Sequence, residues 1–127
     1  MDSFNMNVLV LAYLGDTVYE GYVRRFLIFS GISHVKELQE ASIFYVSAKG
    51  QAKFLSSLLE RNFFFEDELS VIMRARNYKG SRHPKNCDIL TYKHATALEA
   101  VIGYLSLSDK NERIEEMMKL ILEGKLC

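Results

Sequence analysis

Two carboxylates, Asp16 and Glu99, stand inside otherwise apolar stretches of the chain. A carboxylate in apolar surroundings is costly unless it is paired, protonated or bound to a cation. The residues one helical turn before them, Ala12 and Thr96, are small and leave room for a hydrated ion or for a close helix contact. Mg²⁺ prefers oxygen ligands and is often held by one or two carboxylates together with substrate phosphate. If the two segments pack together, the pair predicts a site where a metal ion activates water and polarises a phosphate.

A structural explanation of the same residues stays open. Gly-Asp is a common turn or N-cap signal, and Glu99 is equally suited to bond a neighbouring lysine or tyrosine. Glu20, one turn beyond Asp16, either joins the pair or forms a surface ion pair with Arg24. The chain contains no Glu-x-x-His pair, which counts against a di-iron helical bundle.

Basic residues are concentrated in one segment, although the chain as a whole is neutral, with 16 Lys plus Arg and 16 Asp plus Glu. Between Arg74 and His94, six basic residues accompany one acid, Asp88, so this segment carries +5 and the remainder −5. The six are Arg74, Arg76, Lys79, Arg82, Lys85 and Lys93. A local basic patch is what phosphate binding needs, and the alternative is an ordinary solvated loop.

Hydrophobic periodicity predicts an all-α protein in which helices carry both acids. We expect helices over about 6–29, 33–44, 47–61, 66–76, 91–107 and 109–124, with a basic loop over 78–90. Gly31 ends the first helix, and Ser33, Thr91 and Asp109 are the expected N-caps of later ones. Acids in the first turn and arginines in the last turn of the fourth helix suit its dipole.

Length and composition indicate one globular domain over residues 1–127. The chain is 49% hydrophobic and 25% charged, which excludes a disordered protein. The longest clean apolar stretch, 8–14, is too short to cross a bilayer, and the start has no secretory pattern. Cys87 and Cys127 form no zinc motif, so we expect a reduced, cytoplasmic protein.

Two blocks of the sequence carry a family resemblance. Residues 11–20 read LAYLGDTVYE, and residues 92–105 read YKHATALEAVIGYL. Both resemble signature segments of the ribonuclease III catalytic domain, in the variant carried by the Mini-ribonuclease III family. The intervening RARN at 74–77, with the lysines that follow, is similar to the basic connection of that family. Two long blocks in register are a far stronger signal than one short motif.

The resemblance implies a helical, dimeric endoribonuclease that hydrolyses double-stranded RNA with Mg²⁺, for which Mn²⁺ substitutes. It implies that Asp16 and Glu99 are the metal-binding and catalytic residues, with metal-activated water as nucleophile, and that Tyr13 lies at the homodimer contact. The implied RNA-binding residues are Arg74, Arg76, Asn77, Lys79, Lys85 and Lys93. The implied substrate is the large-subunit (23S) ribosomal RNA precursor. Only about one helix follows the second block, so we expect no double-stranded RNA-binding domain.

The sequence departs from full-length ribonuclease III at two positions that concern metal. The longer enzymes carry Glu and Asp where this chain has Ala12 and Thr96, so this chain offers two fewer carboxylates for a two-ion site. Two other functions remain to be weighed: an inactive relative that only binds RNA, and a helical protein-interaction module. The retained acids argue against the first, and the +5 segment argues against the second.

Overall fold

The computed structural model describes residues 2–80, 85–124 and 126, and in this part of the chain helices joined by turns and loops are the only regular elements, without a strand. A 3₁₀ turn, η1 (Ser3–Asn5), precedes the α-helices. These are α1 (Val8–Phe29), α2 (Val35–Val46), α3 (Ala48–Glu60), α4 (Glu66–Arg76), α5 (Ile89–Leu107) and α6 (Asn111–Leu122). The predicted all-α class is therefore confirmed. Within the described residues, no helix is long and apolar enough to cross a membrane.

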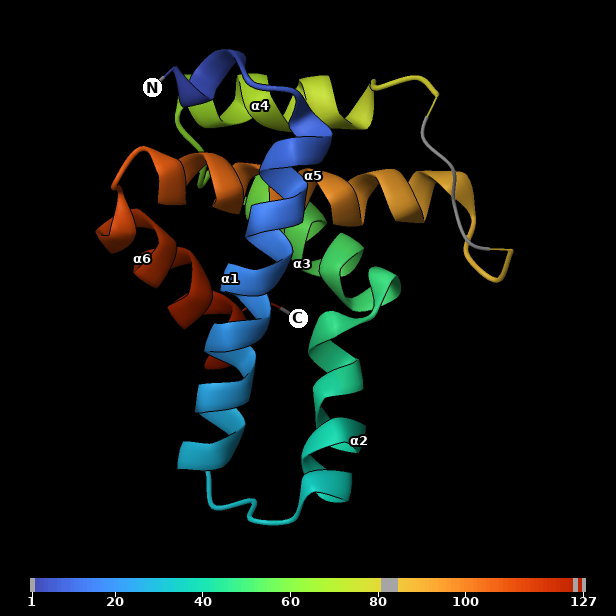
Figure 1. Ribbon diagram of the computed structural model, residues 1–127, viewed down its shortest axis with the longest axis vertical. Coiled ribbons are helices and arrows are strands. Elements are labelled where there is room, and N and C mark those ends of the chain that lie inside the picture. Colours follow the sequence, from blue (N-terminus) through green and yellow to red (C-terminus); the bar gives the residue numbers. More distant parts are fainter. Residues whose placement is uncertain (1, 81–84, 125, 127) are drawn as a thin grey trace.

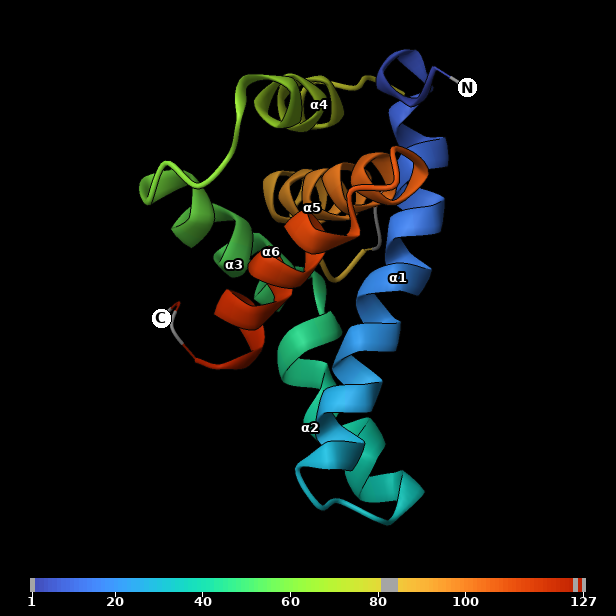
Figure 2. The same ribbon diagram turned by 90° about the vertical axis from the view of Figure 1, so that its left-hand side faces the viewer.

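Helix α5 is the centre of the fold because it is apolar on nearly every side. From Ala95 to Leu105 all of its residues are buried except Glu99, which is half-buried. A helix that is hydrophobic all round must be covered by others. Helices α1, α3, α4 and α6 all pack against it, and Figure 2 shows α5 enclosed between them. The single carboxylate in this buried stretch is therefore held inside the bundle.

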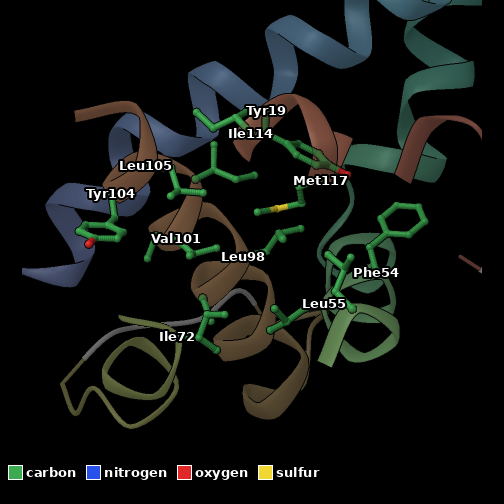
Figure 3. Packing of buried hydrophobic residues seen from close by; sticks show 14 of the residues in the cluster. Tyr19, Phe54, Leu55, Ile72, Leu98, Val101, Tyr104, Leu105, Ile114 and Met117 are labelled. Atoms are coloured by element: carbon green, nitrogen blue, oxygen red, sulfur yellow. The ribbon is translucent and has the colours of Figure 1, made fainter. Parts of the chain in front are cut away.

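The hydrophobic core is built around α5 from side chains of every helix that covers it. Leu98, Val101 and Leu105 point from α5 into the centre of the cluster in Figure 3. The surrounding helices contribute Tyr19, Leu55, Ile72, Ile114 and Met117, all fully buried. This core fixes how α1 and α3 cross α5, and those crossings form the candidate site.

The end of α1 and the whole of α2 project from the bundle as a helical hairpin, at the bottom of Figure 1. The chain turns between them at Gly31, whose φ of 107° lies in the left-handed region that favours glycine. Gly31 therefore ends α1 as predicted. No residue of α2 is buried. The hairpin leaves several large apolar side chains exposed, namely Ile28, Phe29, Val35, Ile43 and Phe44.

All three predicted N-caps are wrong, because a neighbouring residue takes the N-cap position or the predicted residue belongs to another turn. Asp88, not Thr91, caps α5, and its Oδ1 accepts the backbone N–H of Thr91 at 3.0 Å. Asp109 has a φ of 57° and belongs to the end of α5, where Lys110 N–H bonds the Leu105 carbonyl at 2.9 Å. This is a Schellman C-cap, so Asp109 cannot also open α6.

The prediction for α2 fails in the same way: its N-cap is His34 rather than Ser33, and the His34 side chain makes no capping bond. The expected start of the third helix is confirmed, because the Ser47 hydroxyl accepts the backbone N–H of Gly50 at 3.1 Å. The acids of the first turn of α4 and the arginines of its last turn also lie where the sequence places them.

Candidate active site

Helices α1 and α5 touch backbone to backbone at two glycines. A Cβ atom on Gly15 would lie 1.7 Å from the carbonyl oxygen of Glu99, and one on Gly103 would lie 1.9 Å from the carbonyl oxygen of Leu11. No side chain fits at either point, so only glycine allows the crossing. Because Asp16 follows Gly15 directly, the contact brings Asp16 beside Glu99. The structure thus unites the two predicted site carboxylates.

The two carboxylates interact strongly. The pKa of Glu99 is raised from 4.5 to about 8, first by burial and then by the hydrogen bond with Asp16 and the negative charge of that residue. Glu20 adds a small effect in the same direction, whereas a hydrogen bond from Gln51 acts to lower the pKa. Two acids that share one site resist simultaneous ionisation unless a cation balances them. The pair therefore has the electrostatics of a cation site.

Gln51 is the site residue that sequence reasoning missed. It lies in α3, is buried, and donates from Nε2 to Oε2 of Glu99 at 3.3 Å. An amide between Gly50 and Ala52 in a helix carries no unusual sequence signal. Its place in the site appears only once α3 is packed against α5.

Tyr19 links the site to the hairpin. Its ring is fully buried three residues after Asp16, and its hydroxyl donates to the carbonyl oxygen of Tyr45 at 2.6 Å. Burial first, and then the nearby Glu99 carboxylate, raise the pKa of Tyr19, so this hydroxyl keeps its proton. Tyr19 thereby fixes α1 against the end of α2 close to the carboxylate pair.

The donor set fits a hard divalent cation that completes its coordination from water and substrate. Ala12 and Thr96 are buried one turn before Asp16 and Glu99 and add no charge. Glu20 lies 3.6 Å from Arg24 in an exposed ion pair. Among the described residues, no group of three or more His, Cys, Asp and Glu side chains is arranged to hold a metal. Mg²⁺ commonly uses one or two protein carboxylates together with water and substrate phosphate, and this pair supplies two.

The predicted RNA-binding residues fall into two groups. Lys79 and Lys85 are exposed, while Arg76 and Lys93 are half-buried near the end of α4 and the start of α5. Asn77 is the exposed C-cap of α4. Residues 81–84, which include Arg82 of the basic segment, lie outside the described part of the chain.

Arg74 is different because its guanidinium is hydrogen-bonded to backbone carbonyls of the same protein. It donates to the carbonyl oxygens of Phe4 and Met6, at 2.7 Å for Met6, and lies over the Phe4 ring. The structure therefore places Arg74 in the packing of η1 and the start of α1. The sequence shows its charge but cannot show that the N-terminal segment passes over this end of α4.

The fold and the carboxylate pair define a class, the ribonuclease III catalytic domain. The family described as "Ribonuclease III domain" matches residues 9–110. A crystal structure of a protein from Fusobacterium nucleatum is similar, with a TM-score of 0.85 and 30% identity over 94% of this chain and 96% of that one.

Curated relatives identify the family within this class. The Mini-ribonuclease 3 of Brevibacillus brevis is 48% identical over 94% of this chain and 90% of its own length. The Mini-ribonuclease 3 of Staphylococcus aureus is 40% identical, with 92% and 87% covered. The chain belongs to the Mini-ribonuclease 3 family. It is accordingly a hydrolase, an endoribonuclease of double-stranded RNA with the divalent-metal dependence general to ribonuclease III enzymes.

Proposed function

We propose that Asp16 and Glu99 form the metal-binding and catalytic centre, with Mg²⁺ as the ion and Mn²⁺ as a substitute. The observation that carries the proposal is the backbone contact between Gly15 and Glu99, which holds two carboxylates together in a partly buried site. An ion bound there supplies Lewis-acid activation of water and phosphate. Asp16 lies on the exposed side of the pair and Glu99 on the buried side, so the pair opens toward solvent, where a duplex arrives.

The proposed RNA footprint is the segment between α4 and α5. Exposed Lys79 and Lys85 supply charge for phosphates, together with Arg76, Asn77 and Lys93. Such contacts position a duplex without reading its sequence, because A-form RNA hides its base edges in a deep, narrow groove. Lys93 lies in the same helix as Glu99, six residues before it in α5. Arg74 supports this footprint indirectly, by fixing the end of α4.

A symmetric homodimer is the proposed working form, with one carboxylate pair in each subunit so that both strands are cut. Helix α1 carries more apolar surface than its own core contact uses: Tyr13 is 83% exposed and Val10 is 53% exposed. Phe29, further along α1, is 80% exposed. Exposed apolar surface of this kind marks an interaction site, and two-fold dimers are the commonest closed assembly.

The proposed substrate is the large-subunit (23S) ribosomal RNA precursor, and the proposed location is the cytoplasm. Support for the substrate is the resemblance of the 11–20 and 92–105 blocks to the Mini-ribonuclease family. The location is supported by the absence of a cysteine motif in the sequence.

A cleavage assay tests the proposed centre. Wild type, Asp16→Asn and Glu99→Gln are compared on duplex RNA with Mg²⁺ and with EDTA, and Glu112→Gln serves as a control because Glu112 is an exposed acid on α6. Both site variants are expected to lose cleavage while keeping duplex binding, and the control is expected to cut normally. Near-normal cutting by either site variant contradicts the assignment. Wild type that binds duplexes without cutting them with Mg²⁺ supports the inactive-relative alternative.

A further inference from the structure

We propose that Gln51 is a positioning residue that holds the Glu99 carboxylate in place for the metal ion. The inference rests on the proposed Asp16–Glu99 centre and adds a third helix, α3, to it. Gln51 does not contact the reacting atoms. It acts through Glu99, by donating a hydrogen bond to Oε2 of the carboxylate.

The contact is enclosed by protein. Gln51 is only 3% exposed, so its amide has little water to bond. The Nε2–Oε2 separation of 3.3 Å is the hydrogen bond that joins α3 to Glu99. Among the described residues, no buried side-chain nitrogen or oxygen lacks a partner. An amide without this partner would stay buried and unsatisfied, which costs free energy, so the bond is expected to persist.

The position of Gln51 is itself fixed at the junction of α2 and α3. A Cβ atom on Gly50 would lie 2.2 Å from the carbonyl oxygen of Phe44, so the first turn of α3 rests on the last turn of α2. Ser47 caps the same turn through the backbone N–H of Gly50. The amide of Gln51 therefore projects from a rigid corner rather than from a mobile end.

The same junction also locates the other carboxylate. Tyr19, three residues after Asp16 in α1, donates to the carbonyl of Tyr45 in the last turn of α2. The junction of α2 and α3 thus contacts both halves of the site. It holds α1 near Asp16 through the Tyr19 hydrogen bond, and it holds the Glu99 carboxylate through Gln51. This shared anchor is a physical reason for the two acids to keep one separation when an ion binds.

The chemistry of an amide suits this role better than a further acid would. Thr96 and Gly103, one turn before and one turn after Glu99 in α5, carry no charge, and the amide of Gln51 is a neutral donor that reaches Glu99 from another helix. An amide N–H donates to a carboxylate, whereas a second carboxylate at residue 51 would only accept and would repel Glu99. Outer partners that orient metal ligands commonly change metal affinity or activity about 10–100-fold when they are removed.

The test measures Mn²⁺ binding to the RNA-free protein by electron paramagnetic resonance. Gln51→Met keeps the volume and removes the donor. Leu55→Met is the matched control, since Leu55 is fully buried one turn later in α3 and packs in the core. We expect Gln51→Met to weaken Mn²⁺ binding about tenfold, with duplex affinity unchanged, and Leu55→Met to bind Mn²⁺ like wild type. Equal Mn²⁺ affinity in Gln51→Met and wild type overturns the proposal.

Combining the change with Glu99→Gln separates positioning from a general effect on the fold. If Gln51 acts through Glu99, Gln51→Met weakens Mn²⁺ binding no further in the Glu99→Gln background. An equal loss of affinity in both backgrounds contradicts the proposal. Should Gln51→Met fail to fold, Gln51→Asn, which withdraws the amide by one methylene, replaces it with the same expectation.

Failure of the proposed centre has a different signature. Unchanged Mn²⁺ binding in both Asp16→Asn and Glu99→Gln shows that the ion lies elsewhere. Loss of binding in these two variants, together with normal binding in Gln51→Met and Gln51→Asn, leaves the centre intact and overturns the role of Gln51 alone.

Discussion

The backbone of Gly15 lies against the backbone carbonyl of Glu99, so closely that a methyl group on Gly15 would be 1.7 Å from the oxygen. The main-chain positions of Asp16 and Glu99 are consequently held together by backbone contact between α1 and α5. That contact leaves the orientation of each carboxylate to its side-chain partners. A close backbone contact of this kind suits a site with only two protein carboxylates.

Gly15→Ala is expected to force α1 and α5 apart and to destabilise the protein by about 3 kcal/mol or more, because the obstructing atom is backbone rather than a movable side chain. Gly21→Ala is the matched control in the same helix, where nothing lies within 4 Å of the added Cβ. The control is expected to be neutral or to stabilise by up to about 1 kcal/mol. Urea unfolding of both variants measures this, and an equal effect at both positions contradicts the close crossing.

The stability of the metal-free protein is expected to depend on pH through Glu99. The folded state raises the pKa of Glu99 from 4.5 to about 8, so the folded state binds the proton more tightly than the unfolded state does. The stabilisation from this group is full below pH 4.5 and disappears as the pH rises through 8. In EDTA at pH 8, Glu99→Gln is therefore expected to melt roughly 5 °C or more above wild type.

At about pH 5 the two proteins are expected to melt at similar temperatures, because Glu99 is then protonated when folded. Added Mg²⁺ should restore the stability of wild type at about pH 8 and leave the variant unchanged. A difference in melting temperature between wild type and variant that stays constant across this pH range refutes the raised pKa.

Thr96→Asp restores a carboxylate one turn before Glu99, where the longer relatives have one. Thr96 is buried beside the pair, so an added charge is expected to lower the Mg²⁺ concentration for half-maximal cleavage. Thr96→Asn has the same shape without the charge and should leave that midpoint near the wild-type value. Mg²⁺ titrations of single-turnover cleavage measure both. If the aspartate variant is folded and active with an unchanged midpoint, residue 96 does not face the metal.

Lys79→Ala and Lys85→Ala are each expected to weaken binding to all duplexes and to reduce the salt slope of binding by about one unit for each phosphate that is no longer neutralised. Lys119→Ala, an exposed lysine on α6, is the control and should leave the slope unchanged. Arg74→Met should instead lower thermal stability, since it removes the bonds to Phe4 and Met6. Unchanged slopes in both lysine variants place the RNA footprint elsewhere.

The sequence is enough to predict the helical class, most of the helix positions and the pairing of Asp16 with Glu99. Those features depend on local periodicity and on charged residues that stand out in apolar stretches. Gln51 and Arg74 show what local patterns miss. The amide of Gln51 meets Glu99 only after α3 crosses α5, and Arg74 meets Phe4 and Met6 only after the chain start folds over α4.

The wrong N-cap predictions also arise because local sequence patterns leave more than one residue suited to a role. Asp88 and Thr91 both suit an N-cap, and the sequence alone does not decide between two competent residues three positions apart. Asp109 belongs to the end of the preceding helix rather than to the start of the following one. It is the left-handed residue of the Schellman turn that ends α5. The roles of Asp16 and Glu99 in metal binding and catalysis stay predictions.

A crystal of the protein with duplex RNA and Mn²⁺, measured for anomalous scattering, tests the central claim most directly. We expect an anomalous peak within about 2.0–2.3 Å of carboxylate oxygens of both Asp16 and Glu99, with an RNA phosphate oxygen bound to the same ion. A Mn²⁺ peak beside the RNA that touches neither carboxylate contradicts the proposed centre.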